Sequence, residues 1–196
     1  MSTFSTQIPI LSNLNAMNTS FQTHLMGVIA HHTKETTFYV STPNVSKGAS
    51  YTIHCIHAEI KRQIDAGRPL PQKMYLQIDG ASDNTAKAVI ASLEHLVVEG
   101  LCKVIEVWRL PVGHTHEDID SRFGVIQQHI REQSLYTFRD FLLAVHAAFN
   151  YEPTVSVVPV LAIYDYKEFY DQFIDRYIRI YKVRYNTHYH SLYLSL

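Results

Sequence analysis

The sequence predicts an α/β fold with a mixed β-sheet flanked by helices, and three observations support this prediction. Two apolar, β-branched segments, residues 23–31 and 36–41, are joined by a linker short enough for an antiparallel hairpin. From residue 50 onwards, strand-like and helix-like segments alternate, which is typical of parallel strands joined by helices. Hydrophobic residues make up 46% of the chain, which is enough to form a substantial core.

The composition argues against several classes of function. The net charge is −1 and the pI about 6.9, so no global positive field attracts nucleic acid, and such a contact needs a local patch. Cys55 and Cys102 lie in apolar contexts without metal-ligand spacing, which predicts reduced core residues in an intracellular chain. No apolar run has membrane-spanning length and the N-terminus is polar, so no membrane partner is expected.

The first part of the chain is predicted to contain three strands and then a helix. Residues 1–6 are polar and are expected to be loose, and residues 7–11 are expected to form a short strand. The hairpin of residues 23–31 and 36–41 follows. After residue 50, isoleucines recur every third or fourth position, which predicts a helix. They are Ile53, Ile56, Ile60 and Ile64.

Two strand–helix pairs are expected next. Residues 73–79 alternate in polarity and predict a strand that ends in a polar turn at 80–84. A helix is expected from 86 to 100. Residues 104–110 are largely apolar and predict a buried strand, and an apolar stripe of 3.6-residue period predicts the second helix. This stripe consists of Ile119, Phe123, Ile126 and Ile130.

The C-terminal part is predicted to be mainly helical. Thr137 and Asp140 have the spacing of a capping box, which predicts the start of another helix. The composition then shifts: residues 155–163 favour a strand and residues 164–182 an amphipathic helix rich in aromatics. We therefore expect one domain over 1–150 and an extension over 151–196 that packs on it.

The turn before the helix of Ile119 has an unusual density of reactive side chains. In residues 114–120 (HTHEDID), five of the seven can bind a metal or transfer a proton. Asp79 ends the preceding strand, and ligands gather at the carboxyl ends of strands in open α/β sheets. If the two strands are neighbours, these carboxylates converge, and Mg²⁺ or Mn²⁺ would relieve their repulsion. Glu117, Asp120 and Gly124 share one helical face, and Gly124 leaves room there for a ligand.

A plainer interpretation of the same residues is also open. Asp79 then only begins a turn, and Asp83 or Asn84 caps the helix that follows. The acids of the HTHEDID turn would complement the dipole of their helix without binding a metal.

Two segments carry a resemblance to known proteins. The order of elements, with an aspartate ending one strand and an acid on the helix two elements later, resembles the ribonuclease H-like fold of DDE transposases and retroviral integrases. More narrowly, residues 76–84 (LQIDGASDN) and 110–120 (LPVGHTHEDID) resemble an uncharacterised, transposon-associated eukaryotic family with a Gly-His-Thr…Asp signature. The resemblance extends roughly from residue 25 to residue 141.

The resemblance implies a function and a role for each matching residue. The implied chemistry is cleavage and strand transfer of DNA dependent on Mg²⁺ or Mn²⁺, which implies DNA as a partner and residence in the nucleus. Asp79 matches the second metal-binding acid, and Asp120, or alternatively Glu117, matches the third. His114 matches the family histidine and would orient a carboxylate or contact a phosphate.

The first acid of such a triad is missing from its expected place. It belongs on the first strand, but Asn13 and Asn15 follow residues 7–11, and no acid precedes Glu35. An asparagine can ligate a metal but supplies no charge. The alternative function is therefore an inactive, domesticated module that binds nucleic acid or protein. A basic run near the C-terminus, interleaved with tyrosines, could contact phosphates and stack on bases. The more common interpretation of such a run is an amphipathic helix with its aromatics packed inward and its charges solvated. The basic residues of the run are Arg176, Arg179, Lys182 and Arg184.

A third possibility is a metallo-hydrolase. His114, His116 and Asp118 resemble the HxHxDH motif of metallo-β-lactamase-like enzymes, although Ile119 stands where the last histidine is expected. Residues 113–116 also resemble the GHxH motif of calcineurin-like phosphoesterases. The other motifs of both families are missing from the sequence, so this function is the least favoured of the three.

Overall fold

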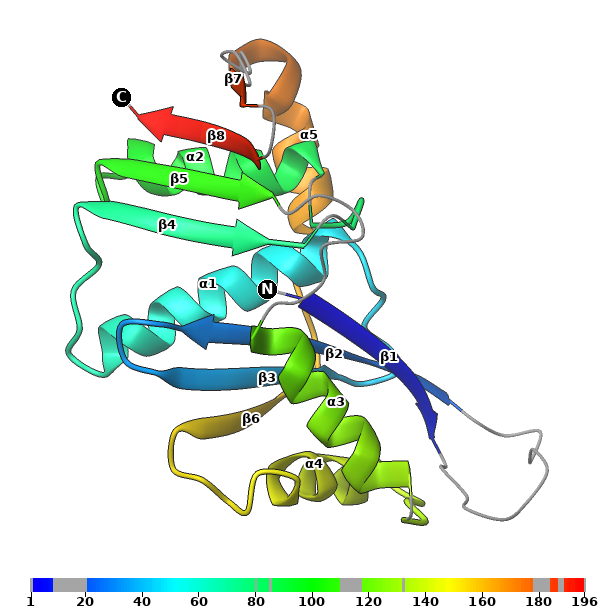
Figure 1. Ribbon diagram of the computed structural model, residues 1–196. Helices are drawn as coiled ribbons and strands as arrows, with labels where there is room; N and C mark the ends of the chain where they lie inside the picture. The colour runs from blue at the N-terminus through cyan, green and yellow to red at the C-terminus, as the bar shows by residue number, and fades with distance from the viewer. Residues whose placement is uncertain are drawn as a thin grey trace. The chain divides into compact units, whose positions relative to one another are not determined.

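The computed structural model supports the predicted order of elements (Figure 1). It describes residues 2–8, 21–79, 81–84, 86–109, 118–131, 133–177, 184–186 and 189–195. The strands are β1 Ser2–Ile8, β2 Phe21–Ala30, β3 Glu35–Ser41, β4 Lys73–Ile78, β5 Val104–Arg109, β6 Val155–Val160, β7 Arg184–Asn186 and β8 Tyr189–Ser195. The helices are α1 Ala49–Asp65, α2 Lys87–Val98, α3 Asp118–Arg131, α4 Phe138–Ala147 and α5 Tyr166–Tyr177. The chain is thus a mixed α/β protein, and the predicted succession β-β-β-α-β-α-β-α is confirmed.

The chain forms two compact units, each built from two separate segments. The first unit contains Met1–Ser46 and His116–Ala162, and the second contains Lys47–Thr115 and Ile163–Leu196. This grouping differs from the division at residue 150 that the sequence suggests. The reason is that β6 completes the sheet of the N-terminal strands, whereas α5 packs against α1 and α2.

The first unit is built on a four-stranded sheet of order β1-β2-β3-β6. The predicted hairpin is confirmed, because β2 and β3 are antiparallel, and β6 adds to β3 in parallel. The expectation that residues 1–6 are loose is wrong. Ser2 to Ile8 pair with β2 over their whole length, from Ser2 opposite Gly27 to Ile8 opposite Phe21. Backbone pairing with an existing strand orders this polar segment despite its lack of an apolar face.

Helices α3 and α4 build the core of this unit on its sheet. The predicted stripe of α3 is confirmed, since all four of its apolar side chains are buried. They pack with residues of β2, β3 and α4, including Leu25, Phe38 and Phe141. The predicted capping box of α4 is also confirmed: Thr137 accepts a hydrogen bond from the backbone of Asp140, whose side chain accepts one from Thr137 N.

The second unit is built on a sheet of order β4-β5-β8-β7. Strands β4 and β5 are parallel, whereas β8 is antiparallel to both β5 and β7. Helix α2 packs against β5 and β8, and α5 packs against α2 and α1. The predicted stripe of α1 is only partly buried: Ile53 and Ile56 are fully enclosed, but Ile64 is 44% exposed.

Two further expectations are corrected by this arrangement. The described strands form two mixed four-stranded sheets, whereas a single mixed sheet was expected. The C-terminal part is not mainly helical, because the strands β7 and β8 follow α5. Strand β8 is held by pairing with the distant β5, which local periodicity cannot reveal. Within the described ranges, no helix is long and apolar enough to cross a membrane.

Candidate functional site

The candidate site is the turn that follows β4, where Asp79 lies. The strand ends at Ile78, which pairs with Arg109, the last residue of the parallel strand β5. The carboxyl ends of the two strands are therefore level and adjacent, as the sequence analysis assumed. Asp79 thus occupies the strand end at which α/β sheets usually bind ligands.

The carboxylate of Asp79 is held by two hydrogen bonds that both end on Oδ1. Ala81 N donates one of them at 2.9 Å, and the side-chain amide of Asn84 donates the other at 2.6 Å. Asn84 N also donates to Ala81 O at 3.1 Å, which closes the turn. Within the described part of the chain, Oδ2 receives no hydrogen bond, so the carboxylate is oriented but retains one oxygen for a ligand.

A residue of helix α1 is hydrogen-bonded to Asn84 of this turn. The hydroxyl of Thr52 donates to Asn84 Oδ1 at 2.7 Å. Thr52 is 1% exposed and Asn84 is fully buried. The turn is therefore connected by side-chain hydrogen bonds to the interior of its own unit.

The structure tests the plainer interpretation of this turn, in which Asp79 begins a turn and Asp83 or Asn84 caps α2. Asp79 does begin a turn, because its carboxylate accepts from the backbone two residues later. The prediction that Asp83 or Asn84 caps α2 is wrong. The N-cap residue of α2 is Ala86, which makes no capping hydrogen bond through its side chain. The polar groups of Asn84 bond to Thr52 and Asp79 instead.

The other predicted site residues lie elsewhere or outside the described residues. Asp120 is half-buried in the first turn of α3, and Asp118 is exposed at its start. Both belong to the first unit, whereas Asp79 belongs to the second. His114, His116 and Glu117 lie outside the described residues, as do Asn13 and Asn15. The convergence of Asp79 with the acids of the HTHEDID turn therefore stays a prediction.

Gly124 is exposed on α3. A Cβ atom added to this residue of α3 would meet no atom within 4 Å. This side of the helix is open within the described structure, and the expectation that a ligand lies there stays a prediction. Of the predicted basic run, Arg179 and Lys182 lie outside the described residues, and only backbone positions are described for Arg176 and Arg184.

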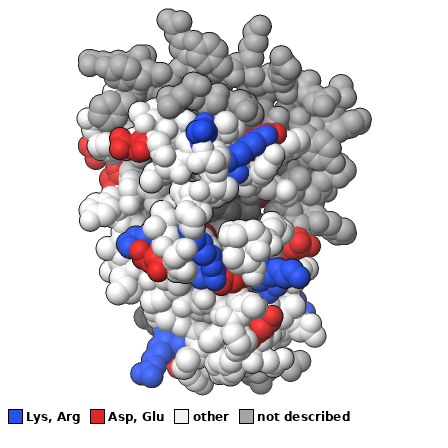
Figure 2. Space-filling model, turned by 90° about the vertical axis from the view of Figure 1, so that its left-hand side faces the viewer, with Lys and Arg blue, Asp and Glu red and all other residues white. Residues whose placement is uncertain are grey.

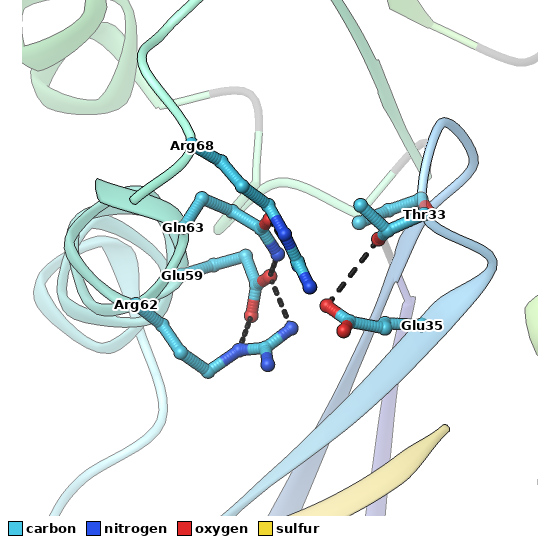
Figure 3. A network of polar contacts seen from close by, with 7 residues as sticks. Thr33, Glu35, Glu59, Arg62, Gln63 and Arg68 are labelled. Atoms are coloured by element: carbon cyan, nitrogen blue, oxygen red, sulfur yellow. Dashed lines mark hydrogen bonds and ion pairs between the residues drawn. The ribbon is translucent and has the colours of Figure 1, made fainter. Parts of the chain in front are cut away.

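A buried carboxylate in the same unit serves as a comparison. Figure 3 shows Glu59 near the end of α1, where Arg62 donates to both of its oxygens and Gln63 donates to one of them. Arg68 in turn donates to Gln63 Oε1 at 2.9 Å. Glu59 is thus occupied on both oxygens, which indicates a structural role. The same figure shows the hydroxyl of Thr33 near the carboxylate of Glu35 in the turn between β2 and β3.

The cysteines are free and buried, as the sequence predicts. Burial raises the pKa of the Cys55 thiol far above its ordinary value, and burial also raises the pKa of Cys102. A raised pKa leaves little thiolate, the reactive form. Neither residue is therefore suited to nucleophilic catalysis.

Sequence reasoning missed a cluster of histidines and tyrosines on α1, α2 and α5. The ring of Tyr166 lies 5.5 Å from that of His57 and 6.5 Å from that of His54, measured between centroids. His95 Nδ1 lies 3.0 Å from the hydroxyl of Tyr170. The three-residue spacing of His54 and His57 places both on one face of α1, a signal that the sequence contains.

This cluster predicts that acid destabilises the second unit. Burial, followed by repulsion from His95 and His54, lowers the pKa of His57 below its ordinary 6.5, and His57 Nε2 has no hydrogen-bond partner among the described residues. The unfolded chain then binds more protons than the folded one, so stability is lost as the pH falls through 6.5 towards the folded-state pKa. Burial raises the pKa of Glu94 above 4.5, so this acid partly offsets the loss at lower pH.

The measurement is the thermal midpoint of unfolding between about pH 8 and about pH 5.5. We expect a decrease across this interval, and a smaller one in His57→Gln, which cannot be protonated. His32→Gln, which changes an exposed histidine in the turn after β2, is the control. An identical pH dependence in His57→Gln and the native chain would contradict this account.

The charged residues on the face shown in Figure 2 have no dominant sign. Figure 2 shows Lys and Arg side chains interspersed with Asp and Glu on the face that it presents. Among the described residues visible there, the basic side chains form no continuous patch, in agreement with the net charge of −1.

Comparison with known proteins gives a family but no established activity. No curated protein and no solved structure shows a significant match to the chain. The sequence pattern of the family described as "Domain of unknown function (DUF7869)" matches residues 13–192, which is most of the chain. The match includes β2 to β5, Asp79 and the whole HTHEDID turn. The chain therefore belongs to the DUF7869 family.

Proposed function

We propose that this chain is a ribonuclease H-like domain of the transposase and integrase type, with divalent-metal-dependent polynucleotidyl transfer on DNA as its ancestral chemistry. The observation that carries the proposal is the position of Asp79. It follows β4 at the carboxyl end of a parallel strand pair, and the strand beside it, β5, leads directly into the HTHEDID segment. This is the placement from which two acids of different strands can serve one ligand.

The donor atoms of these residues suit a hard divalent cation. Carboxylate oxygens are the preferred ligands of Mg²⁺ and Mn²⁺, and Asp79 has one oxygen without a hydrogen bond among the described residues. Asp79 would hold the cation together with Asp120 or Glu117, and His114 would orient a carboxylate or contact a phosphate. A cation bound there supplies activation of a water or of a 3′-hydroxyl.

A calorimetric titration with Mn²⁺ tests this proposal. We expect the native chain to bind Mn²⁺ and Asp79→Ala to lose this binding, because the variant removes a charged ligand. The thermal midpoint of the variant is measured as well, because Ala81 N and the Asn84 amide lose their acceptor. Asp83→Ala is the matched control, since it removes a carboxylate from the same turn. It should bind like the native chain. A Mn²⁺-dependent cleavage assay on labelled DNA should then show activity that Asp79→Ala lacks.

The second candidate function is an inactive module that binds nucleic acid or protein. The observation that favours it is the absence of any acid before Glu35, where the first metal ligand is expected. A site with one charged ligand fewer binds a cation more weakly. Absence of Mn²⁺ binding in the native chain, or equal binding in Asp79→Ala, would contradict the enzyme proposal and favour this module.

A further inference from the structure

We propose that Asn84 and Thr52 are positioning residues that fix the carboxylate of Asp79, so that its Oδ2 is left to hold a metal. This inference rests on the proposed function, because it assigns the orientation of the metal ligand named there. Asn84 and Thr52 come from the turn after β4 and from α1, and both belong to the same unit as Asp79.

The hydrogen bonds allow only one orientation of the Asn84 amide. Its NH₂ group lies 2.6 Å from Asp79 Oδ1, and a carboxylate oxygen can only accept. Its carbonyl oxygen therefore points towards Thr52, whose hydroxyl donates at 2.7 Å. A reversed amide would place two oxygens against each other at the Asp79 end. The relay thus runs from the Thr52 hydroxyl through the amide to the carboxylate.

Burial makes this orientation rigid. Asn84 is 0% exposed and Thr52 is 1% exposed, so water does not compete for their polar groups. A buried polar group that loses its partner costs about 1–3 kcal/mol, which disfavours any rotation of the amide. The two hydrogen bonds therefore hold the carboxylate of Asp79 in a fixed position relative to α1.

The relay also decides which oxygen of Asp79 is left for a ligand. Asn84 Nδ2 and Ala81 N both donate to Oδ1, whereas Oδ2 receives no hydrogen bond within the described part of the chain. Two donors on one oxygen reduce its capacity to bind a cation as well. Oδ2 is therefore the oxygen of Asp79 that would hold a cation.

The expected loss of Mn²⁺ affinity follows from the usual effect of residues that hydrogen-bond to a metal ligand. Residues that orient a ligand typically change metal affinity by about 10- to 100-fold when they are removed. Asn84→Ala should therefore weaken Mn²⁺ binding about tenfold or more. Thr52→Val removes the hydroxyl at constant shape and should weaken binding in the same direction.

The experiment measures Mn²⁺ affinity by calorimetry, together with the thermal midpoint of each variant. Thr52→Ser retains the hydroxyl and should restore nearly native affinity, which a purely steric role of Thr52 would not predict. Ser92→Ala is the structural control, because it removes a fully buried hydroxyl of the same unit that donates only to Val89 O. It should change the thermal midpoint without changing Mn²⁺ affinity.

The outcomes separate this inference from the proposed function. If Asp79→Ala loses Mn²⁺ binding but Asn84→Ala and Thr52→Val bind like the native chain, the positioning role is overturned and the metal site stands. If Asn84→Ala does not fold, the comparison of Thr52→Val with Thr52→Ser still decides the question. Absence of Mn²⁺ binding in the native chain would overturn both proposals.

Discussion

Replacing Phe38 by alanine is expected to lower the free energy of unfolding by about 3–5 kcal/mol, the cost usually found for removing a buried phenyl ring. Phe38 is fully buried in β3. Its ring centroid lies 5.4 Å from that of Phe149, in a stacked arrangement, and 5.9 Å from that of Phe123. Loss of the ring would remove contacts with α3 and with the segment after α4 and would leave a cavity between them.

Urea denaturation followed by circular dichroism measures this effect. Tyr136→Ala is the control, because Tyr136 belongs to the same unit and is 65% exposed. Exposed substitutions of this kind usually change stability by less than about 0.5 kcal/mol. An equal loss of stability in the two variants would show that Phe38 is not part of a packed core.

Replacing Gly27 by alanine is expected to destabilise the first unit by about 1–3 kcal/mol, the usual cost of an overpacked core. A Cβ at Gly27 would lie 2.4 Å from Ile119 Cδ1, 2.7 Å from Ile119 Cγ1 and 3.1 Å from Phe123 Cζ. Both contacted residues are buried in α3, so they have little freedom to move away. Glycine at this position of β2 therefore permits the close approach of α3 to the sheet.

The same substitution at Gly124 provides a matched comparison. A Cβ there meets nothing within 4 Å, and alanine in a helix interior is favoured over glycine by about 0.5–1 kcal/mol. Gly124→Ala should therefore raise the thermal midpoint while Gly27→Ala lowers it. Equal shifts in the two variants would contradict the close packing of α3 on β2.

Elements with a strong local pattern were predicted well from the sequence. The stripe of α3, the capping box of α4 and the hairpin of β2 and β3 all depend on residues close together in the chain. For such elements, periodicity and capping chemistry agree with the final packing. The position of Asp79 at a strand end was predicted for the same reason, because Lys73–Ile78 alternates clearly.

Elements that depend on distant partners were not predicted. The polar strand β1 is ordered by pairing with β2, and β8 by pairing with β5, which lies about half the chain away. The relay from Thr52 to Asp79 was missed for a similar reason. Thr52 looks like an ordinary helical residue, and only the packing of α1 brings it to Asn84. The plainer interpretation had Asp83 or Asn84 as the helix cap, because the position of both before α2 also suits that role.

Mn²⁺ titration of Asp120→Asn beside Asp118→Asn tests whether Asp120 is a metal ligand. We proposed Asp79 and Asp120 as ligands of one cation, with Glu117 as the alternative to Asp120. Asp118 is the matched control, because it is an exposed acid in the same helical turn. We predict that Asp120→Asn folds normally and loses Mn²⁺ binding, as Asp79→Ala does, while Asp118→Asn binds normally. Native affinity in Asp120→Asn would contradict the assignment of Asp120.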